Sequence, residues 1–128
     1  MLKTMTTRFG IIGYPLTHSV SPVMQQAAID YLDLDATYEV WESPPESLGA
    51  TLEWLRKTPG VRGANITVPF KEEVFNKLDW ADPIARDAGA VNTIVINEGR
   101  LAGYNTDVGG FITALQQAQF NNEKSNRV

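Results

Sequence analysis

The fold prediction rests first on residues 65–71, Asn65-Ile66-Thr67-Val68-Pro69-Phe70-Lys71. Its first residues are small or β-branched and predict a buried strand, but Pro69 cannot continue a central ladder. Because residues 72–78 have helical character, we place Pro69 in the first turn of a helix, where its missing N–H costs nothing. A strand that passes directly into a helix is where open α/β sheets bind ligands.

The polar side chains of this stretch suggest what kind of ligand would bind. Asn65 offers an amide, Thr67 a hydroxyl and Lys71 a cation. This combination suits a polyhydroxylated or carboxylated small molecule.

Outward from this stretch, expected strands alternate with expected helices along the whole chain. Apolar and β-branched runs predict strands over 9–14, 37–42, 61–68, 91–96 and 100–104, the last two forming a hairpin across 97–99. Helices are expected from residues 21, 45, 69 and 83, and from Thr106 or Asp107 as a final N-cap. The alternation predicts an α/β three-layer sandwich with a mixed, mostly parallel sheet.

Helix ends and apolar faces give more detailed predictions. Ser21 is expected to be an N-cap with Pro22 at the first helical position, and Asp82 and Gly89 are expected to bracket a short helix. Helical spacing predicts buried faces made of Val23, Met24, Ala27, Ala28 and Tyr31 in the first helix, of Leu48, Leu52 and Leu55 in the second, and of Val108, Phe111, Leu115 and Ala118 in the last.

The expected topology gathers polar residues that lie far apart in the sequence. The loop after the first strand carries Ser19 and Ser21, and the loop after the third carries Thr67 and Lys71. The end of the hairpin carries residues 105–107. If the strands before these loops run in parallel, all three loops open at one sheet edge and their side chains meet in one cleft.

Composition excludes several classes of function. The 128 residues carry 11 basic and 15 acidic side chains, a net charge of −4, which argues against a nucleic-acid surface. There is no cysteine and one histidine, so neither a disulfide nor a metal site is predicted. No stretch reads as a signal peptide or a membrane span, and we expect a cytoplasmic protein without a membrane partner.

Each candidate residue also has an ordinary structural explanation. Lys71, beside two glutamates, is typical of a solvated helix face, and Asp107 of an N-cap. Alternatively the two would form an acid–base pair. Ser19 and Ser21 suit a loop and a cap, or else a carboxylate site, and His18 suits a loop or packing role better than a base. No glycine-rich Gly-x-Gly-x-x-Gly turn follows a strand, so a dinucleotide site is not predicted in this chain.

Five ordered motifs resemble the shikimate dehydrogenase family. They are Phe9-Gly10-Ile11-Ile12-Gly13-Tyr14-Pro15, His18-Ser19-Val20-Ser21-Pro22, Gly63-Ala64-Asn65-Ile66-Thr67-Val68-Pro69-Phe70-Lys71, Gly89-Ala90-Val91-Asn92-Thr93 and Gly103-Tyr104-Asn105-Thr106-Asp107. The resemblance runs from about residue 9 to about 120 and covers the substrate-binding domain of that family.

The resemblance implies reversible, NADP-dependent reduction of 3-dehydroshikimate to shikimate in aromatic amino acid biosynthesis. It implies that Lys71 and Asp107 are the catalytic pair, which protonates the carbonyl oxygen as hydride reaches the carbon. The implied substrate ligands are Ser19 and Ser21 for the carboxylate, and Asn65, Thr67, Asn92, Asp107 and Lys71 for the ring hydroxyls.

The chain departs from the family pattern in one large respect. Members of the family continue into an NADP-binding Rossmann domain, which this sequence does not include. We expect residues 1–120 to be the substrate-binding domain and 121–128 a polar linker toward the absent cofactor domain. The chain alone is then expected to be inactive, and its uncovered apolar surface to favour self-association.

A non-catalytic module that binds shikimate, quinate or a similar small acid is the alternative function. The sequence leaves open the choice between shikimate and quinate and between NADP and NAD.

Overall fold

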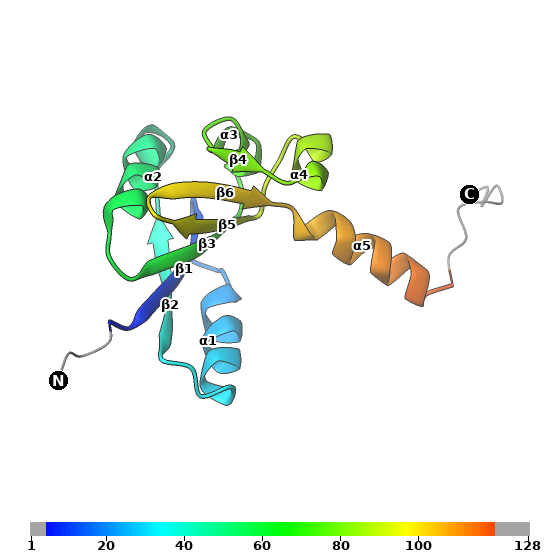
Figure 1. The fold of residues 1–128 in the computed structure, drawn as a ribbon. Helices are drawn as coiled ribbons and strands as arrows, with labels where there is room; N and C mark the ends of the chain where they lie inside the picture. The colour runs from blue at the N-terminus through cyan, green and yellow to red at the C-terminus, as the bar shows by residue number, and fades with distance from the viewer. Residues whose placement is uncertain (1–4, 120–128) are drawn as a thin grey trace.

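The computed structural model describes residues 5–119, which form a six-stranded sheet flanked by helices (Figure 1). The strands are β1 (Thr7–Gly13), β2 (Ala36–Glu42), β3 (Val61–Ile66), β4 (Trp80–Ala81), β5 (Thr93–Asn97) and β6 (Arg100–Tyr104). The helices are α1 (Ser21–Tyr31), the 3-10 turn η1 (Pro45–Ser47), α2 (Leu48–Lys57), α3 (Lys71–Phe75), α4 (Pro83–Ala88) and α5 (Thr106–Gln117). The predicted polar linker, 121–128, lies outside the described residues.

The sheet topology confirms the predicted fold class and the predicted meeting of loops. The strand order is β2-β1-β3-β5-β6-β4. β1 pairs in parallel with β2 and β3, β4 pairs in parallel with β6, and only β5 runs against its neighbours β3 and β6. Since β1, β3 and β6 point the same way, the loops that follow them open at one edge of the sheet.

The hydrophobic core lies between the sheet and α2, α3 and α4. Ile12, Phe70, Leu55 and Ile94 are fully buried there, and Leu48 and Leu52 join Leu55 on the buried face predicted for α2. Each such side chain contributes roughly 1.5–3 kcal/mol of hydrophobic stabilisation. Figure 1 shows α1 on the other side of the sheet.

Pro69 does not lie in the first turn of a helix, as predicted, but in a turn before α3. The Val68–Pro69 peptide bond is cis, Thr67 O accepts a hydrogen bond from Phe70 N at 3.0 Å, and helical bonding begins with Val74 N donating to Phe70 O at 2.8 Å. The buried Phe70 side chain anchors this turn in the core. As a result α3 begins at Lys71, the last residue of the opening stretch.

Two of the predicted helix caps are wrong, and a third is confirmed. α1 has Val20 as its N-cap, because Val20 O already accepts the helical bond from Met24 N, so Ser21 lies inside the helix. α5 is capped by Asn105 rather than by Thr106 or Asp107. The Asp82 side chain caps α4 as predicted, by accepting from Ala85 N, and Gly89 ends that helix with a φ of 66°.

The apolar faces predicted for α1 and α5 are not buried against the described residues. Val23, Met24 and Tyr31 are 77%, 58% and 89% exposed, and no residue of α5 is buried. α1 instead faces the sheet with Ile29 and with Gln26, whose amide bonds Tyr38 N and Ala36 O in β2. α5 extends away from the sheet (Figure 1), so none of the described elements packs over its apolar side.

Candidate functional site

Lys71 and Asp107 form an ion pair at the sheet edge where the loops meet. Lys71 Nζ lies 2.7 Å from Asp107 Oδ2, although 36 residues separate them in the sequence. Lys71 is the first residue of α3 and Asp107 the second residue of α5. The two side chains are 37% and 54% exposed, so a ligand can reach both.

Asn105 leaves Asp107 free for this contact. Asn105 Oδ1 accepts from Val108 N at 3.1 Å, and its Nδ2 donates to Ala90 O at 3.0 Å. The cap of α5 is therefore a buried amide held on both sides. The structural explanation of Asp107 as an N-cap is thus wrong.

Asn92, immediately before β5, holds the carboxylate of the pair. Its Nδ2 donates to Asp107 Oδ1 at 3.0 Å and to Thr106 Oγ1 at 2.7 Å, while its Oδ1 accepts from Thr106 N at 2.9 Å. Its main chain bonds Tyr104 O and Ile66 N. Since all of these groups are satisfied, the Asn92 side chain is rigidly placed.

Only the family resemblance pointed to Asn92; our reasoning from residue patterns missed it. The residues predicted from topology alone follow strands, whereas Asn92 comes immediately before β5. Because β5 is the antiparallel strand, its beginning lies at the edge where β3 and β6 end. The signal that could have found Asn92 was a polar residue near the start of the first strand of the predicted hairpin, 91–96.

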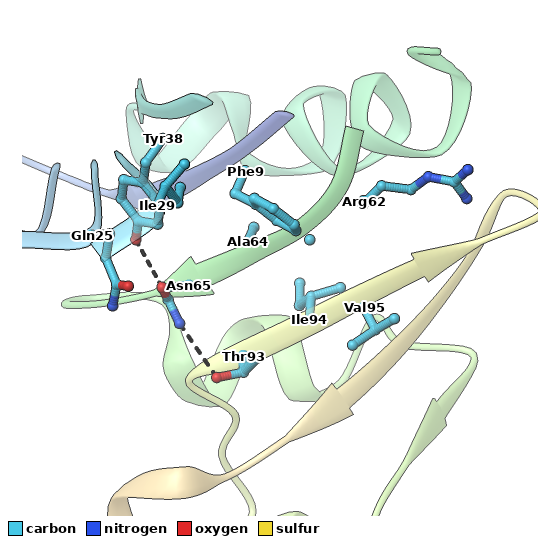
Figure 2. Close-up of a pocket in the computed structure, with 11 residues that line it drawn as sticks. Phe9, Gln25, Ile29, Tyr38, Arg62, Ala64, Asn65, Thr93, Ile94 and Val95 are labelled. Carbon is cyan, nitrogen blue, oxygen red and sulfur yellow. Dashed lines mark hydrogen bonds between the residues drawn. The ribbon is translucent and has the colours of Figure 1, made fainter. Parts of the chain in front are cut away.

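Asn65 continues this polar network into the sheet. Figure 2 shows its side chain between Tyr38 and Thr93. Its Oδ1 accepts from the Tyr38 hydroxyl at 2.7 Å, and its Nδ2 donates to Thr93 Oγ1 and to Asn92 O, both at 3.3 Å. Sequence reasoning did not single out Tyr38 or Thr93.

A second group of candidates lines a cavity of about 280 Å³ beside the loop after β1. Ser19 and Thr67 both line it, together with His18, Tyr14 and Val68. Val68 also borders a neighbouring hollow of about 340 Å³ that contains Lys71. Ser21 is outside both linings, but its main-chain N–H donates to Ser19 Oγ at 3.3 Å.

Glu42 fixes the loop that carries these serines. Its Oε1 accepts from Leu16 N at 2.8 Å, and Leu16 O in turn accepts from Ser19 N at 3.2 Å. Gly13 lets the loop start close to β3, because a Cβ there would collide with the side chain of Thr67. The structure thereby brings Ser19 and Thr67 together in the wall of the 280 Å³ cavity. Lys71, Asp107 and Asn92 form a separate hydrogen-bonded group at the same sheet edge.

The free hydrogen-bonding capacity of the edge suits a hydroxylated ligand with a carbonyl. Lys71 uses one of its three N–H donors on Asp107, and each Asp107 oxygen accepts one bond within the described residues. A ligand oxygen between them can accept from the ammonium and donate to the carboxylate. Such a pair can move a proton to or from that oxygen.

Comparisons with known proteins identify the family. Residues 11–94 match the model of the shikimate dehydrogenase substrate binding domain. The chain belongs to this family.

Relatives and solved structures agree with this assignment. The shikimate dehydrogenase (NADP(+)) of Thermus thermophilus is 45% identical over 109 residues, which are 85% of this chain and 41% of the relative. That of Aquifex aeolicus is 44% identical over 116 residues, 91% of this chain and 43% of the relative. A crystal structure of the Thermus thermophilus enzyme, in complex with NADP(H) and shikimate, superposes with a TM-score of 0.81 at 43% identity, over 88% of this chain and 42% of that one.

The chain therefore spans about two fifths of the length of the shikimate dehydrogenases it matches. Its described residues do not fit the NADP that those relatives use. Between β1 and α1 the backbone follows the proline-containing loop 14–20, and β3 leads into the turn at Pro69. Neither is a glycine-rich turn that would admit a pyrophosphate. Within residues 5–119, no helix is both long and apolar enough to cross a bilayer.

Proposed function

We propose that this chain is the substrate-binding and acid–base half of an NADP-dependent shikimate dehydrogenase. The reaction is the reversible reduction of 3-dehydroshikimate to shikimate in aromatic amino acid biosynthesis, in the cytoplasm. The observation that carries the proposal is the accessible 2.7 Å pair of Lys71 and Asp107 at the sheet edge. Residues 1–120 form the substrate-binding domain, and 121–128 lead toward the cofactor domain.

Different residues bind the carboxylate and the ring hydroxyls of the substrate. Ser19 and Ser21 bind the carboxylate, Ser19 from the wall of the 280 Å³ cavity. Thr67, in the same wall, and the amides of Asn65 and Asn92 bind ring hydroxyls. Proximity of Val68 to both hollows supports one ligand that reaches from Ser19 to Lys71.

Lys71 and Asp107 carry out the proton transfer. As the carbonyl carbon gains hydride, its oxygen takes a proton from the Lys71 ammonium, and the Asp107 carboxylate holds that ammonium in place. In the oxidation direction the pair takes the proton back from the hydroxyl. The hydride belongs to NADP bound outside the described residues, so the chain alone binds substrate without turning it over.

A non-catalytic small-acid module is the second candidate. It is favoured by the poor fit of the described residues to a dinucleotide. Such a module would bind shikimate or quinate and never support turnover.

Calorimetry on the purified chain tests the proposal. Shikimate should bind, NADP⁺ should not, and Asp107→Ala should abolish most of the shikimate heat while Asp87→Ala, on the exposed side of α4, should not. Adding the cofactor-binding part of a relative should then restore NADPH-dependent turnover. Binding without any restored turnover would favour the non-catalytic module.

A further inference from the structure

The Tyr38 hydroxyl lies at the far end of the polar network that reaches Asp107. Tyr38 belongs to β2, and its ring is partly buried beside α1 and β1, in the groove drawn in Figure 2. Its hydroxyl donates to Asn65 Oδ1 at 2.7 Å. Burial raises the pKa of Tyr38 to about 12, so the hydroxyl keeps its proton at physiological pH and remains a donor.

This bond satisfies the carbonyl half of the Asn65 side chain. The other half, Nδ2, donates to Asn92 O, immediately before β5, and to Thr93 Oγ1, in the first residue of β5. An amide group has two donors and one acceptor atom. With Tyr38 as donor to the acceptor atom, both Asn65 donors point toward β5.

Thr93 links the oriented amide of Asn65 to Asn92 and, through Asn92, to the ion pair. Because its Oγ1 accepts from Asn65, its own proton is directed to Asn92 Oδ1, at 3.1 Å. Asn92 then presents its Nδ2 to Asp107 Oδ1 at 3.0 Å. Four hydrogen bonds in series therefore connect Tyr38 in β2 to the carboxylate in α5.

We propose that Tyr38 is a positioning residue of the substrate site, whose hydroxyl orders Asn65, Thr93 and Asn92 and thereby the carboxylate of Asp107. Tyr38 itself does not have to touch the substrate. It acts by keeping the amide of Asn65 in one orientation, so that the polar edge is arranged before substrate arrives. The effect on substrate binding rests on the proposed function, whereas the effect on the network does not.

The test compares Tyr38→Phe with Tyr31→Phe in the whole 128-residue chain. Tyr38→Phe removes one oxygen and keeps the ring, and Tyr31 is a matched control because its side chain is 89% exposed at the end of α1. Nitrogen–proton correlation spectra report the side-chain amide resonances of Asn65 and Asn92, and a shikimate titration reports affinity. Circular dichroism melting confirms that each variant is folded.

Tyr38→Phe should shift the amide resonances of Asn92, which it does not contact directly, and should weaken shikimate binding by roughly 3- to 10-fold, the value of one hydrogen bond. Tyr31→Phe should change neither. Unshifted Asn92 resonances in a folded Tyr38→Phe chain would overturn the inference.

The two proposals fail in distinguishable ways. If the wild-type chain bound no shikimate but Tyr38→Phe still shifted the Asn92 resonances, the ordering role would stand and the proposed function would fall. If Tyr38→Phe bound shikimate as the wild type does, Tyr38 would not be a positioning residue of the site.

Discussion

Asn105 and Asp107 lie two residues apart at the start of α5, and the helix cap belongs to Asn105 alone. Asn105 Oδ1 accepts from Val108 N at 3.1 Å, while Asp107 extends to Lys71 at 2.7 Å. Asn105 therefore caps the helix, whereas Asp107 is left to pair with Lys71.

This division predicts opposite profiles for their alanine variants. Asn105→Ala should lower the free energy of unfolding by about 1–2 kcal/mol, because it removes a buried cap. Asp107→Ala should lower it by less than about 1 kcal/mol, since its ion pair is exposed to solvent. Urea denaturation of the two variants measures both values. A larger loss for Asp107→Ala would mean that the carboxylate, and not Asn105, holds the helix.

The loop that carries Ser19 should depend on Glu42. Glu42→Ala removes the acceptor of Leu16 N and leaves the loop free to move away from β3. Shikimate affinity in calorimetry should fall roughly 3- to 10-fold, the value of one hydrogen bond, with little change in melting temperature. Glu46→Ala, on the exposed 3-10 turn, is the matched control and should bind as the wild type does. Equal affinities for the two variants would show that Glu42 does not position the loop.

Acid should remove the stabilisation supplied by Arg8 and Glu39. The Arg8 guanidinium donates two 2.8 Å hydrogen bonds to the Glu39 carboxylate, and the side chains of Thr37 and Trp41 donate to it as well. These hydrogen bonds lower the pKa of Glu39 to about 2, from its ordinary 4.5. A lowered carboxylate pKa stabilises the fold above pH 4.5, and this contribution is lost as pH falls toward 2.

Glu39→Gln measures that contribution. At pH 7 the variant should be less stable by about 1 kcal/mol, given the partial exposure of the pair. The gap to wild type should close as the pH of the unfolding experiment is lowered from 4.5 to 2. A gap that stays constant across this range would mean that the ion pair does not stabilise the fold.

The exposed apolar side of α1 should make the chain self-associate. Val23 and Met24 are 77% and 58% exposed, and an apolar groove of about 380 Å³ lies on the same side of the sheet, beside Ile29. We expect sedimentation equilibrium to detect association that rises with concentration and weakens in the Val23→Ser/Met24→Ser double variant. Val40→Ser, on the half-exposed β2 position, is the control. A monomer at all concentrations would contradict the expectation.

Sequence periodicity predicted the fold well where burial alone decides the structure. The second half of β1 is apolar because this central parallel strand is covered on both faces, and Leu48, Leu52 and Leu55 do bury one face of α2. The two-residue β4 was not predicted, because so short a strand has no period. The prediction that α1 and α5 bury their apolar faces was wrong, because the described residues do not cover these faces. Helical periodicity shows that a face is apolar, but it does not show what packs against it.

The candidate site could be predicted only in part, for a topological reason. Lys71 and Asp107 follow strands that end at the same edge of the sheet, so the sequence alone could predict that the loops carrying them meet. Asn92 precedes a strand that runs the other way, and Tyr38 lies inside β2, where a tyrosine reads as an ordinary strand former. The contact of Tyr38 in β2 with Asn65 in β3 reaches across β1, which lies between these two strands, so predicting it needs the strand order.

Turnover of a chimaera shows whether this chain supplies substrate binding and proton transfer. In it, this chain replaces the matching 109 residues of the Thermus thermophilus shikimate dehydrogenase, so that the relative supplies the rest of the enzyme. Lys71→Met is compared with Lys57→Met, whose side chain is 79% exposed in α2.

The unmodified chimaera and Lys57→Met should reduce 3-dehydroshikimate with NADPH. Lys71→Met should lower kcat by about 10²-fold or more while changing KM far less, because positioned proton transfer acts on the chemical step. A folded Lys71→Met chimaera with unchanged kcat, or a folded chimaera without any turnover, would contradict the assignment of this chain as the substrate-binding and proton-transferring half of the enzyme.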